Sequence, residues 1–305
     1  MLISVILCTY NGEKYLCELL DSLEAQTRKY DELIIADDNS SDKTNSIIND
    51  YAINRANVTI LHNKKGKGAA RNFLEASLLA KGDIVFFCDQ DDIWIKDKLE
   101  KMCDIMQENA GINMLASSLI PIYESRKKPI QSRLALEKQP ADGRIEKVAI
   151  DAKNFNIKRS GCTMCVRKDY LYKIWPAWVP GWYHDDFVWK CSVMNGSAAI
   201  YNYVTVKRRI HDSNTSISIQ RSAQGRIKNI QDEIDFSKIA YSQIKDQDCT
   251  VQKELDRFIN FQNRRKRVVE EHSFCDFFYN VFINHKLFRT RSQLLMDGYF
   301  LIHNK

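Results

Sequence analysis

The chain has 305 residues, of which 44% are hydrophobic and 28% are charged, and its formal net charge is +6. These values are ordinary for a globular protein with a sizeable core, built as one large domain or as a domain with an appendage. The modest charge permits contact with an anionic surface without establishing one. No apolar stretch approaches the roughly 20 residues that cross a bilayer, so a transmembrane segment is excluded.

The cysteines and the first residues bear on location. Nine cysteines cannot all pair within one chain, and Cys8, Cys88 and Cys165 lie in apolar runs where cysteine is usually a small buried side chain. Residues 2–10 are apolar, but the run is short and lacks a basic flank, so we expect no cleaved leader. We therefore expect a cytoplasmic protein, with peripheral contact to the inner face of the plasma membrane left open.

The first 110 residues alternate between short apolar runs, typical of buried strands, and amphipathic segments, typical of helices. The predicted strands are residues 3–9, 32–38, 57–63 and 83–89. The predicted helices lie within residues 12–26, 40–51, 66–82 and 95–109. Such alternation predicts the α/β class, with a Rossmann-like, mostly parallel sheet that carries helices on both faces.

The remainder of the chain completes this domain and adds a helical region. Strands are expected at 112–123 and 197–210, a strand that runs into a helix at 160–171, and a helix at 184–196. We predict one domain over residues 1–221, whose halves are about 1–110 and 111–221, followed by a helical C-terminal region over 222–305.

Polar clusters follow each of the four N-terminal strands. They are TYNG (residues 9–12), DDNSSD (37–42), NKKGKG (63–68) and DQDD (89–92). In an open α/β sheet, ligands bind beyond the carboxyl ends of the strands. A single cluster of this kind is most simply a turn with helix caps. Four clusters on one edge, one of them a carboxylate triplet, indicate a functional rim.

The triplet Asp89, Asp91 and Asp92 places three like charges within four positions. A cation among them would relieve their repulsion, and oxygen ligands without imidazole or thiolate pairs favour Mg²⁺ or Mn²⁺. Such an ion usually shares its ligands with substrate phosphates, so a divalent ion on a diphosphate is the expected occupant. The chain has neither the P-loop pattern nor the dinucleotide fingerprint.

Four stretches together closely resemble the inverting nucleotide-sugar glycosyltransferases of family 2, which have the GT-A fold. They are ISVILCTYNGEKYLCELLDSLEAQT (residues 3–27), IIADDNSSDKT (34–44), NKKGKGAARN (63–72) and GDIVFFCDQDDIW (82–94). The resemblance covers residues 1–215, and the DQDDIW form is most similar to rhamnosyltransferase-type bacterial members that build surface polysaccharides. It implies transfer of a hexosyl, deoxyhexosyl or N-acetylhexosaminyl group from a UDP- or dTDP-sugar to a saccharide acceptor. That acceptor could be lipid-linked, and the product would be O-antigen, capsule or exopolysaccharide.

The resemblance also implies residue roles at the rim. Asp91 would ligate Mn²⁺ or Mg²⁺, with Asp89 and His211 in the same metal shell, and Asp92 would be a helix-capping or supporting acid. The implied nucleotide-sugar contacts are Thr9, Tyr10, Asn11, Glu13, Asp38, Lys67, Arg71, Asp89 and Gln90.

A later acidic pair is implied to supply the catalytic base. Residues 182–196 (WYHDDFVWKCSVMNG) match its place, with Asp185 as the base and Asp186 as the rival. The alternative is that both acids only cap a helix N-terminus, where the helix dipole favours them. Arg208 and Arg209 are predicted either to offset diphosphate charge or to be solvated. Predicted contacts to acceptor or sugar are Trp94, Gly161 and His184, with buried packing an equal alternative for the tryptophan.

Residues 222–305 lie outside the resemblance and combine aromatic and basic residues at helical spacing. One interpretation is that these helices pack on the catalytic domain. The other is a patch that docks on anionic lipid, with Arg264, Arg265, Lys266 and Arg267 supplying the charge.

Two other function classes stay open. A sugar-phosphate nucleotidyltransferase usually has a glycine-rich stretch after its first strand, which TYNGEKY lacks. A degenerate nucleotide-sugar-binding scaffold is expected to have lost the acidic triplet or the later acid pair, and both are present. Nucleic-acid binding is not expected, because the basic residues are dispersed among acids.

Overall fold

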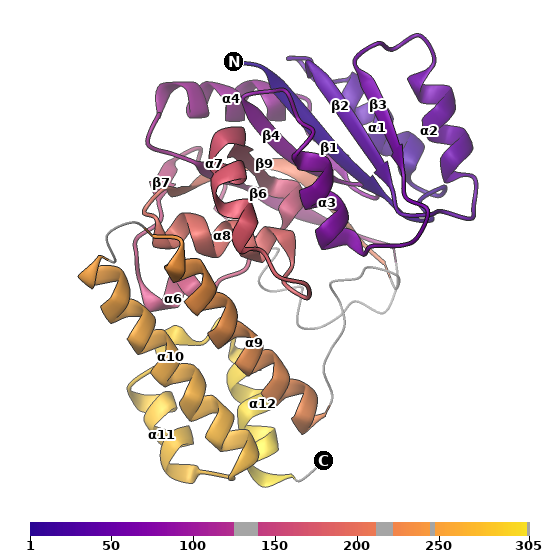
Figure 1. Ribbon diagram of the computed structural model, residues 1–305. Coiled ribbons are helices and arrows are strands. Elements are labelled where there is room, and N and C mark those ends of the chain that lie inside the picture. Colours follow the sequence, from indigo (N-terminus) through magenta and orange to yellow (C-terminus); the bar gives the residue numbers. More distant parts are fainter. Residues whose placement is uncertain (125–139, 212–221, 245–247, 304–305) are drawn as a thin grey trace. The chain divides into compact units, whose positions relative to one another are not determined.

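The computed structural model describes residues 1–124, 140–211, 222–244 and 248–303 (Figure 1). The chain forms two compact units. Unit 1 comprises Met1–Lys147, Arg159–Ser192 and Ser197–His211, and unit 2 comprises Val148–Lys158, Val193–Gly196 and Asp212–Lys305. The domain boundary predicted at residue 221 lies outside the described residues.

Unit 1 is built on one sheet, which has nine strands over the described residues. The strands are β1 (Ile3–Thr9), β2 (Glu32–Asp37), β3 (Val58–His62), β4 (Ile84–Asp89), β5 (Ile93–Trp94), β6 (Met114–Tyr123), β7 (Ile145–Lys147), β8 (Met164–Arg167) and β9 (Ala198–Ile210). Their order is β3-β2-β1-β4-β8-β6-β9-β5, and β7 also pairs with β9. The predicted α/β class and the four predicted N-terminal strands are confirmed. The sheet is mixed, because β5, β7 and β8 run antiparallel to their neighbours.

Alternate strand residues bury opposite faces of this sheet against helices. The helices are α1 (Leu16–Glu24), α2 (Thr44–Ala52), α3 (Ala69–Ser77), α4 (Lys98–Glu108), α7 (Lys168–Ile174) and α8 (His184–Met194). Val5 and Leu7 share a fully buried cluster with apolar residues of α1 and α4. Phe87 points to the other face, where its ring meets that of Phe73 on α3 at 5.8 Å. The strands therefore read as continuous apolar runs because both faces are covered (Figure 1).

The register brings the carboxyl ends of the parallel strands to one edge. Thr9 lies opposite Asp37, and Cys8 lies opposite Asp89. Strands β6 and β9 are parallel to each other, and both reach the same edge because β8 is antiparallel to β4 and to β6. His211, which follows β9, is therefore placed at this edge, here called the rim.

Unit 2 is helical. Its helices are α6 (Ala152–Phe155), α9 (Ala223–Ser242), α10 (Cys249–Glu270), α11 (Phe274–Phe282) and α12 (Arg291–Ile302). Phe258 and Phe261 of α10 are fully buried in its core. In the described part of the chain, no helix has both the length and the apolar character needed to cross a bilayer.

A buried ion-pair network ties α9, α10 and α12 together. Asp297 of α12 is 1% exposed and accepts hydrogen bonds from Arg226 of α9, at 2.5 Å, and from Arg265 of α10, at 2.7 Å. Arg265 is itself 3% exposed. The prediction that Arg265 belongs to a basic surface patch is therefore wrong, because a guanidinium this deeply buried needs an internal carboxylate partner.

Replacing Asp297 should test this network. Asp297→Asn leaves two largely buried guanidinium groups without their carboxylate, and we expect it to lower the free energy of unfolding of unit 2 by about 3–5 kcal/mol. Urea unfolding followed by circular dichroism measures the change. The exposed Asp256→Asn on α10 is the matched control and should shift stability by less than about 0.5 kcal/mol. Equal effects of the two substitutions would contradict the assignment.

Candidate active site

The loop after β1 is tied to the loop after β4 by one side-chain amide. Gln90 accepts a hydrogen bond from the Tyr10 backbone N–H at 2.8 Å and donates to the Tyr10 carbonyl at 2.9 Å. A Cβ at Gly12 would lie 2.2 Å from the Gln90 oxygen, so a larger residue here would displace the Gln90 amide from its two bonds to Tyr10. Gln90 thus holds the two loops in register, whereas the Tyr10 side chain is exposed at the rim.

Three predicted nucleotide contacts also hold the rim loops in shape. Thr9 is 2% exposed, and its hydroxyl donates to the Asp37 carboxylate of β2 at 2.8 Å. Asn11, with a positive φ of 48°, accepts from a backbone N–H of the loop leading into α2. Glu13 accepts from a second backbone N–H of that loop at 2.9 Å. The loops after β1 and β2 therefore form one hydrogen-bonded surface.

Asp38 organises the glycine-containing loop before α3. Its carboxylate accepts from the backbone N–H groups of Lys67, at 2.8 Å, and Gly68, at 2.9 Å. The side chains of Lys67 and Arg71 both pair with Glu75, at 2.7 and 2.6 Å. The structure therefore gathers these predicted residues beside the rim, with the two cations held by a carboxylate of α3.

The acidic triplet brings like-charged carboxyl groups close together at the rim. Asp89, Asp92 and Cys162 place one potential ligand atom each within 4.8 Å of one another. Burial, with repulsion from Asp92 and Asp91, raises the pKa of Asp89 well above its ordinary value. Burial and the Asp91 charge raise the pKa of Asp92 to about 6. The positive charge around these two carboxyl groups is too small to offset burial and repulsion, so their ionised forms are disfavoured.

Asp92 has a larger role than the sequence predicted. One of its oxygens accepts the backbone N–H of Arg209 at 3.0 Å, and the other is buried with no hydrogen-bond partner among the described residues. Of the two roles expected for it, helix capping is excluded, because the residue precedes β5 and bonds to the backbone of β9, and the role of a supporting acid remains. The Cys162 thiol lies near this carboxylate and favours its charged form, and a buried carboxylate oxygen with so little hydrogen bonding is a suitable ligand for a cation.

Two basic side chains, Arg208 and Lys98, and the imidazole of His211 lie around the triplet. Arg208 interacts electrostatically with Asp92 and Asp89 and donates to the Ser160 hydroxyl at 3.0 Å. His211 places its Nε2 2.8 Å from an Asp91 oxygen, so the two residues predicted to share a metal shell lie side by side. Lys98, which sequence reasoning missed, is fully buried beneath them with its ammonium 3.8 Å from the Trp94 ring centroid. Its segment carries no motif, so only the fold could reveal it.

Arg209, the second arginine of this strand, serves the structure. It is 8% exposed and donates to the Asp91 carbonyl at 3.0 Å and to Glu124 at 2.8 Å. It also pairs with Glu18 of α1. Both alternatives drawn from the sequence, contact with a diphosphate or solvation, are therefore replaced by an internal ion-pair network.

The donor set fits a hard divalent cation. Asp89, Asp91 and Asp92 supply carboxylate oxygens, the ligands that Mg²⁺ and Mn²⁺ prefer. Cys162 does not fit such an ion, because burial raises the pKa of its thiol well above the ordinary value and keeps it protonated. The metal ligands would therefore be the carboxylates, with His211 beside Asp91.

The two acids at the start of α8 have different surroundings. Asp186 is 2% exposed and accepts from the Trp182 indole N–H at 2.8 Å and from the buried Lys190 ammonium at 2.7 Å. Asp185 is half-buried, and one of its oxygens accepts the Asp186 backbone N–H at 2.8 Å. Its charge acts on Asp89. Asp186 is thus engaged in an internal ion pair, and Asp185 is the acid that faces the triplet.

The predicted sugar contacts need correction. Trp94 is 3% exposed and packs against Phe86, with ring centroids 6.0 Å apart. His184 is 7% exposed and stacks on Phe73 at 4.2 Å, and burial lowers its pKa. A Cβ at Gly161 would lie 2.4 Å from His184 Nε2, so this glycine makes room for the imidazole. Both large side chains belong to the core: Trp94 lies in the cluster that α1 and α4 cover, and His184 lies against Phe73 of α3.

Comparison with known proteins matches this arrangement to a family. The family described as Glycosyl transferase family 2 matches residues 4–175, which is more than half of the chain. The chain belongs to glycosyl transferase family 2. The match spans every rim loop from β1 to β4 and ends directly after α7, before the acid pair of α8.

Curated relatives in this family share the N-terminal half. The UDP-Glc:alpha-D-GlcNAc-diphosphoundecaprenol beta-1,3-glucosyltransferase WfgD of Escherichia coli is 36% identical over 108 residues, 35% of this chain and 42% of that protein. The dTDP-rhamnosyl transferase RfbG of Shigella flexneri is 30% identical over 171 residues, 54% of this chain and 55% of that protein. The chain spans about half the length of the curated relatives it matches.

A solved structure extends the likeness to nearly the whole chain. Residues 1–349 of S. aureus TarS in complex with UDP-GlcNAc match with a TM-score of 0.65, over 98% of this chain and 80% of that one. The identity is 20%, so this comparison bears on the fold. The predicted GT-A fold with a helical C-terminal region is confirmed.

The different surroundings of the two α8 acids can be tested by stability. Asp186→Asn removes the carboxylate that neutralises the fully buried Lys190, and we expect it to lower the free energy of unfolding by about 3–5 kcal/mol. Asp185→Asn keeps the side-chain shape and should cost less than about 1 kcal/mol. Thermal unfolding of the two variants beside the wild type measures both changes. The reverse order of stability would show that the ion pair has been assigned to the wrong acid.

Proposed function

We propose that the chain is an inverting, metal-assisted glycosyltransferase that moves a sugar from a nucleoside-diphosphate sugar to an acceptor hydroxyl in cell-surface polysaccharide synthesis. The observation that carries this proposal is the position of Asp185, a half-buried acid beside the triplet whose charge acts on both Asp89 and Arg208. A UDP-sugar or dTDP-sugar donor is supported by the names of two relatives, one a UDP-glucose enzyme and one a dTDP-rhamnosyl transferase.

The chemical step needs one base and one stabilised leaving group. Asp185 takes the proton of the acceptor hydroxyl while that oxygen bonds to the anomeric carbon of the donor. The bond from this carbon to the diphosphate oxygen breaks on the opposite face, and the configuration inverts. The rim loops bind the nucleoside, so the reacting atoms meet in a fixed geometry. Asp186 keeps α8 in place through Lys190 and Trp182, which orients the neighbouring base.

A divalent cation would be held by Asp91 and Asp89, with Asp92 and His211 beside them. When bound, Mn²⁺ or Mg²⁺ would offset the negative charge that develops on the departing diphosphate. The raised pKa values of Asp89 and Asp92 support this proposal, because the half-buried and the buried carboxyl group repel each other with too little compensating charge. Arg208 contributes a permanent positive charge to the same cluster.

A donor panel with two variants tests the proposal. UDP- and dTDP-sugars are offered with Mn²⁺ or Mg²⁺, and transfer is followed by release of the nucleoside diphosphate. We expect Asp185→Asn to bind the donor with unchanged affinity and to transfer about 10²–10⁴-fold more slowly, because only the base is lost. Asp91→Ala should lose activity together with metal-dependent donor binding.

The control is Asp169→Asn, an exposed acid in the first turn of α7, which should keep full activity. If no nucleotide sugar binds the wild type, the transferase proposal fails and the scaffold alternative gains. Formation of a nucleotide sugar from a sugar phosphate and a nucleoside triphosphate would instead establish a nucleotidyltransferase. Full activity of Asp185→Asn would remove that residue as the base and leave the family assignment intact.

A further inference from the structure

Helix α11 has its polar residues inside and its apolar residues outside. Asp276 and Asn280 are 6% and 1% exposed. The solvent-facing side carries aromatic side chains and no charge: Phe274 (56% exposed), Phe278 (50%), Tyr279 (43%) and Phe282 (71%), with Ile283 (62%) directly after the helix. A helix on a water-facing surface normally shows the opposite arrangement.

Ion pairs with α10 fix this orientation. Asp276 accepts hydrogen bonds from Arg264 and Arg267, both at 2.6 Å, and the bonds from Arg267 lower the pKa of Asp276 to about 2. Asn280 accepts from Asn284 at 2.9 Å. Rotating the helix to bury its phenyl rings would break these bonds and leave the Asp276 carboxylate without its arginine partners. The aromatic face is therefore held outward by the same contacts that hold the helix to unit 2.

The exposed rings form one continuous surface. Phe278 stacks on Phe282 with ring centroids 6.2 Å apart, and Phe277 meets Phe278 edge-on at 5.7 Å. Contiguous exposed apolar patches of this kind mark interaction sites, because leaving several aromatic side chains in water is unfavourable.

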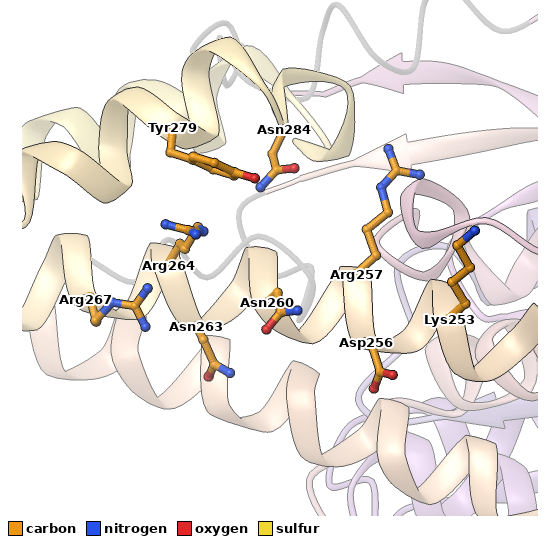
Figure 2. Close-up of a pocket in the computed structure, with 9 residues that line it drawn as sticks. All are labelled: Lys253, Asp256, Arg257, Asn260, Asn263, Arg264, Arg267, Tyr279 and Asn284. Carbon is orange, nitrogen blue, oxygen red and sulfur yellow. The ribbon is translucent and has the colours of Figure 1, made fainter.

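A basic cleft lies beside the aromatic face. It has a volume of about 500 Å³ and is lined by Asp256 and by four cationic side chains, Lys253, Arg257, Arg264 and Arg267. The three arginines also pair with carboxylates, Arg257 with Glu254 and the other two with Asp276. Figure 2 shows the cations arrayed along α10 and Tyr279 of α11 opposite them. The Arg264 guanidinium lies 3.8 Å from the Tyr279 ring centroid, so cation and aromatic surfaces meet at this residue.

We propose that α11 docks unit 2 on an anionic lipid bilayer. The phenyl rings of Phe274, Phe278 and Phe282 would enter the boundary between headgroups and acyl chains, and the cations of the cleft would meet lipid phosphates. Charge complementarity selects this partner, because the aromatic face carries no charged group while the cleft at its border is lined by four cationic side chains. The inference concerns docking alone and holds for any donor or acceptor at the rim.

Vesicle binding by the full chain tests the inference. The chain is sedimented with vesicles of phosphatidylcholine alone and with vesicles that also contain phosphatidylglycerol. We expect binding to the anionic vesicles that weakens at high salt and falls about tenfold for each of Phe278→Ser and Phe282→Ser. Lys253→Gln should cost about fivefold on anionic vesicles and nothing on neutral ones.

Two controls separate docking from misfolding and from general stickiness. Ile53→Ser and Leu79→Ser remove apolar side chains of unit 1 that are 59% and 53% exposed, and they should leave vesicle binding unchanged. The phenylalanine variants should keep the wild-type melting temperature, because the side chains they remove are solvent-facing, and they should keep transfer to a water-soluble acceptor.

Three results would overturn the inference. The wild type could fail to bind anionic vesicles, or it could bind neutral and anionic vesicles equally. It could also sediment as a dimer that Phe278→Ser dissociates, without any vesicle binding, which would make the aromatic face an interface between copies. The proposed function has a separate failure, because loss of transfer in Asp185→Asn is measured without vesicles.

Discussion

Burying several carboxylates in one place costs free energy through lost hydration and mutual repulsion, and the rim of unit 1 is organised around that cost. Asp89, Asp91 and Asp92 follow a strand with both faces covered, so water cannot solvate them fully. Three groups of the surrounding chain interact with these carboxylates: the Arg208 guanidinium, the Arg209 backbone N–H and the His211 imidazole. The compensation stays incomplete at Asp92, one oxygen of which is buried without a hydrogen-bond partner among the described residues, and a bound cation would relieve that deficit.

The acid pair of α8 shows how adjacent carboxylates acquire separate tasks. Asp186 is neutralised by Lys190 one turn along the helix and is sealed from solvent. Asp185 is only half-buried, and its charge acts on Asp89 of the triplet. Similar acids in a polar and in a buried setting commonly divide a structural and a chemical role in this way. The buried pair also anchors the first turn of α8, so the position of Asp185 depends on the ion pair of its neighbour.

Unit 2 uses the same physics for a different purpose. Its helices are joined by buried carboxylates, Asp276 and Asp297, that each bind two arginine side chains. Such pairs have strict geometry and so orient the helices as well as holding them. In α11 the result is a helix whose aromatic side faces outward. The apolar surface that would usually form a core contact is thereby available for an external partner.

The sequence by itself determined the alternation of strands and helices, the α/β class and the edge of the sheet where the polar clusters meet. It did so because strand and helix periods are local and because parallel strands share one carboxyl edge. Only the tertiary structure decided which of Asp185 and Asp186 forms a buried ion pair, and that Trp94 and His184 are buried. It also decided that Arg265 is buried and that the phenyl rings of α11 face solvent. Local spacing shows which side chains share a face, but whether that face is buried depends on partners distant in the sequence, such as Asp297 for Arg265, and Phe73 for His184.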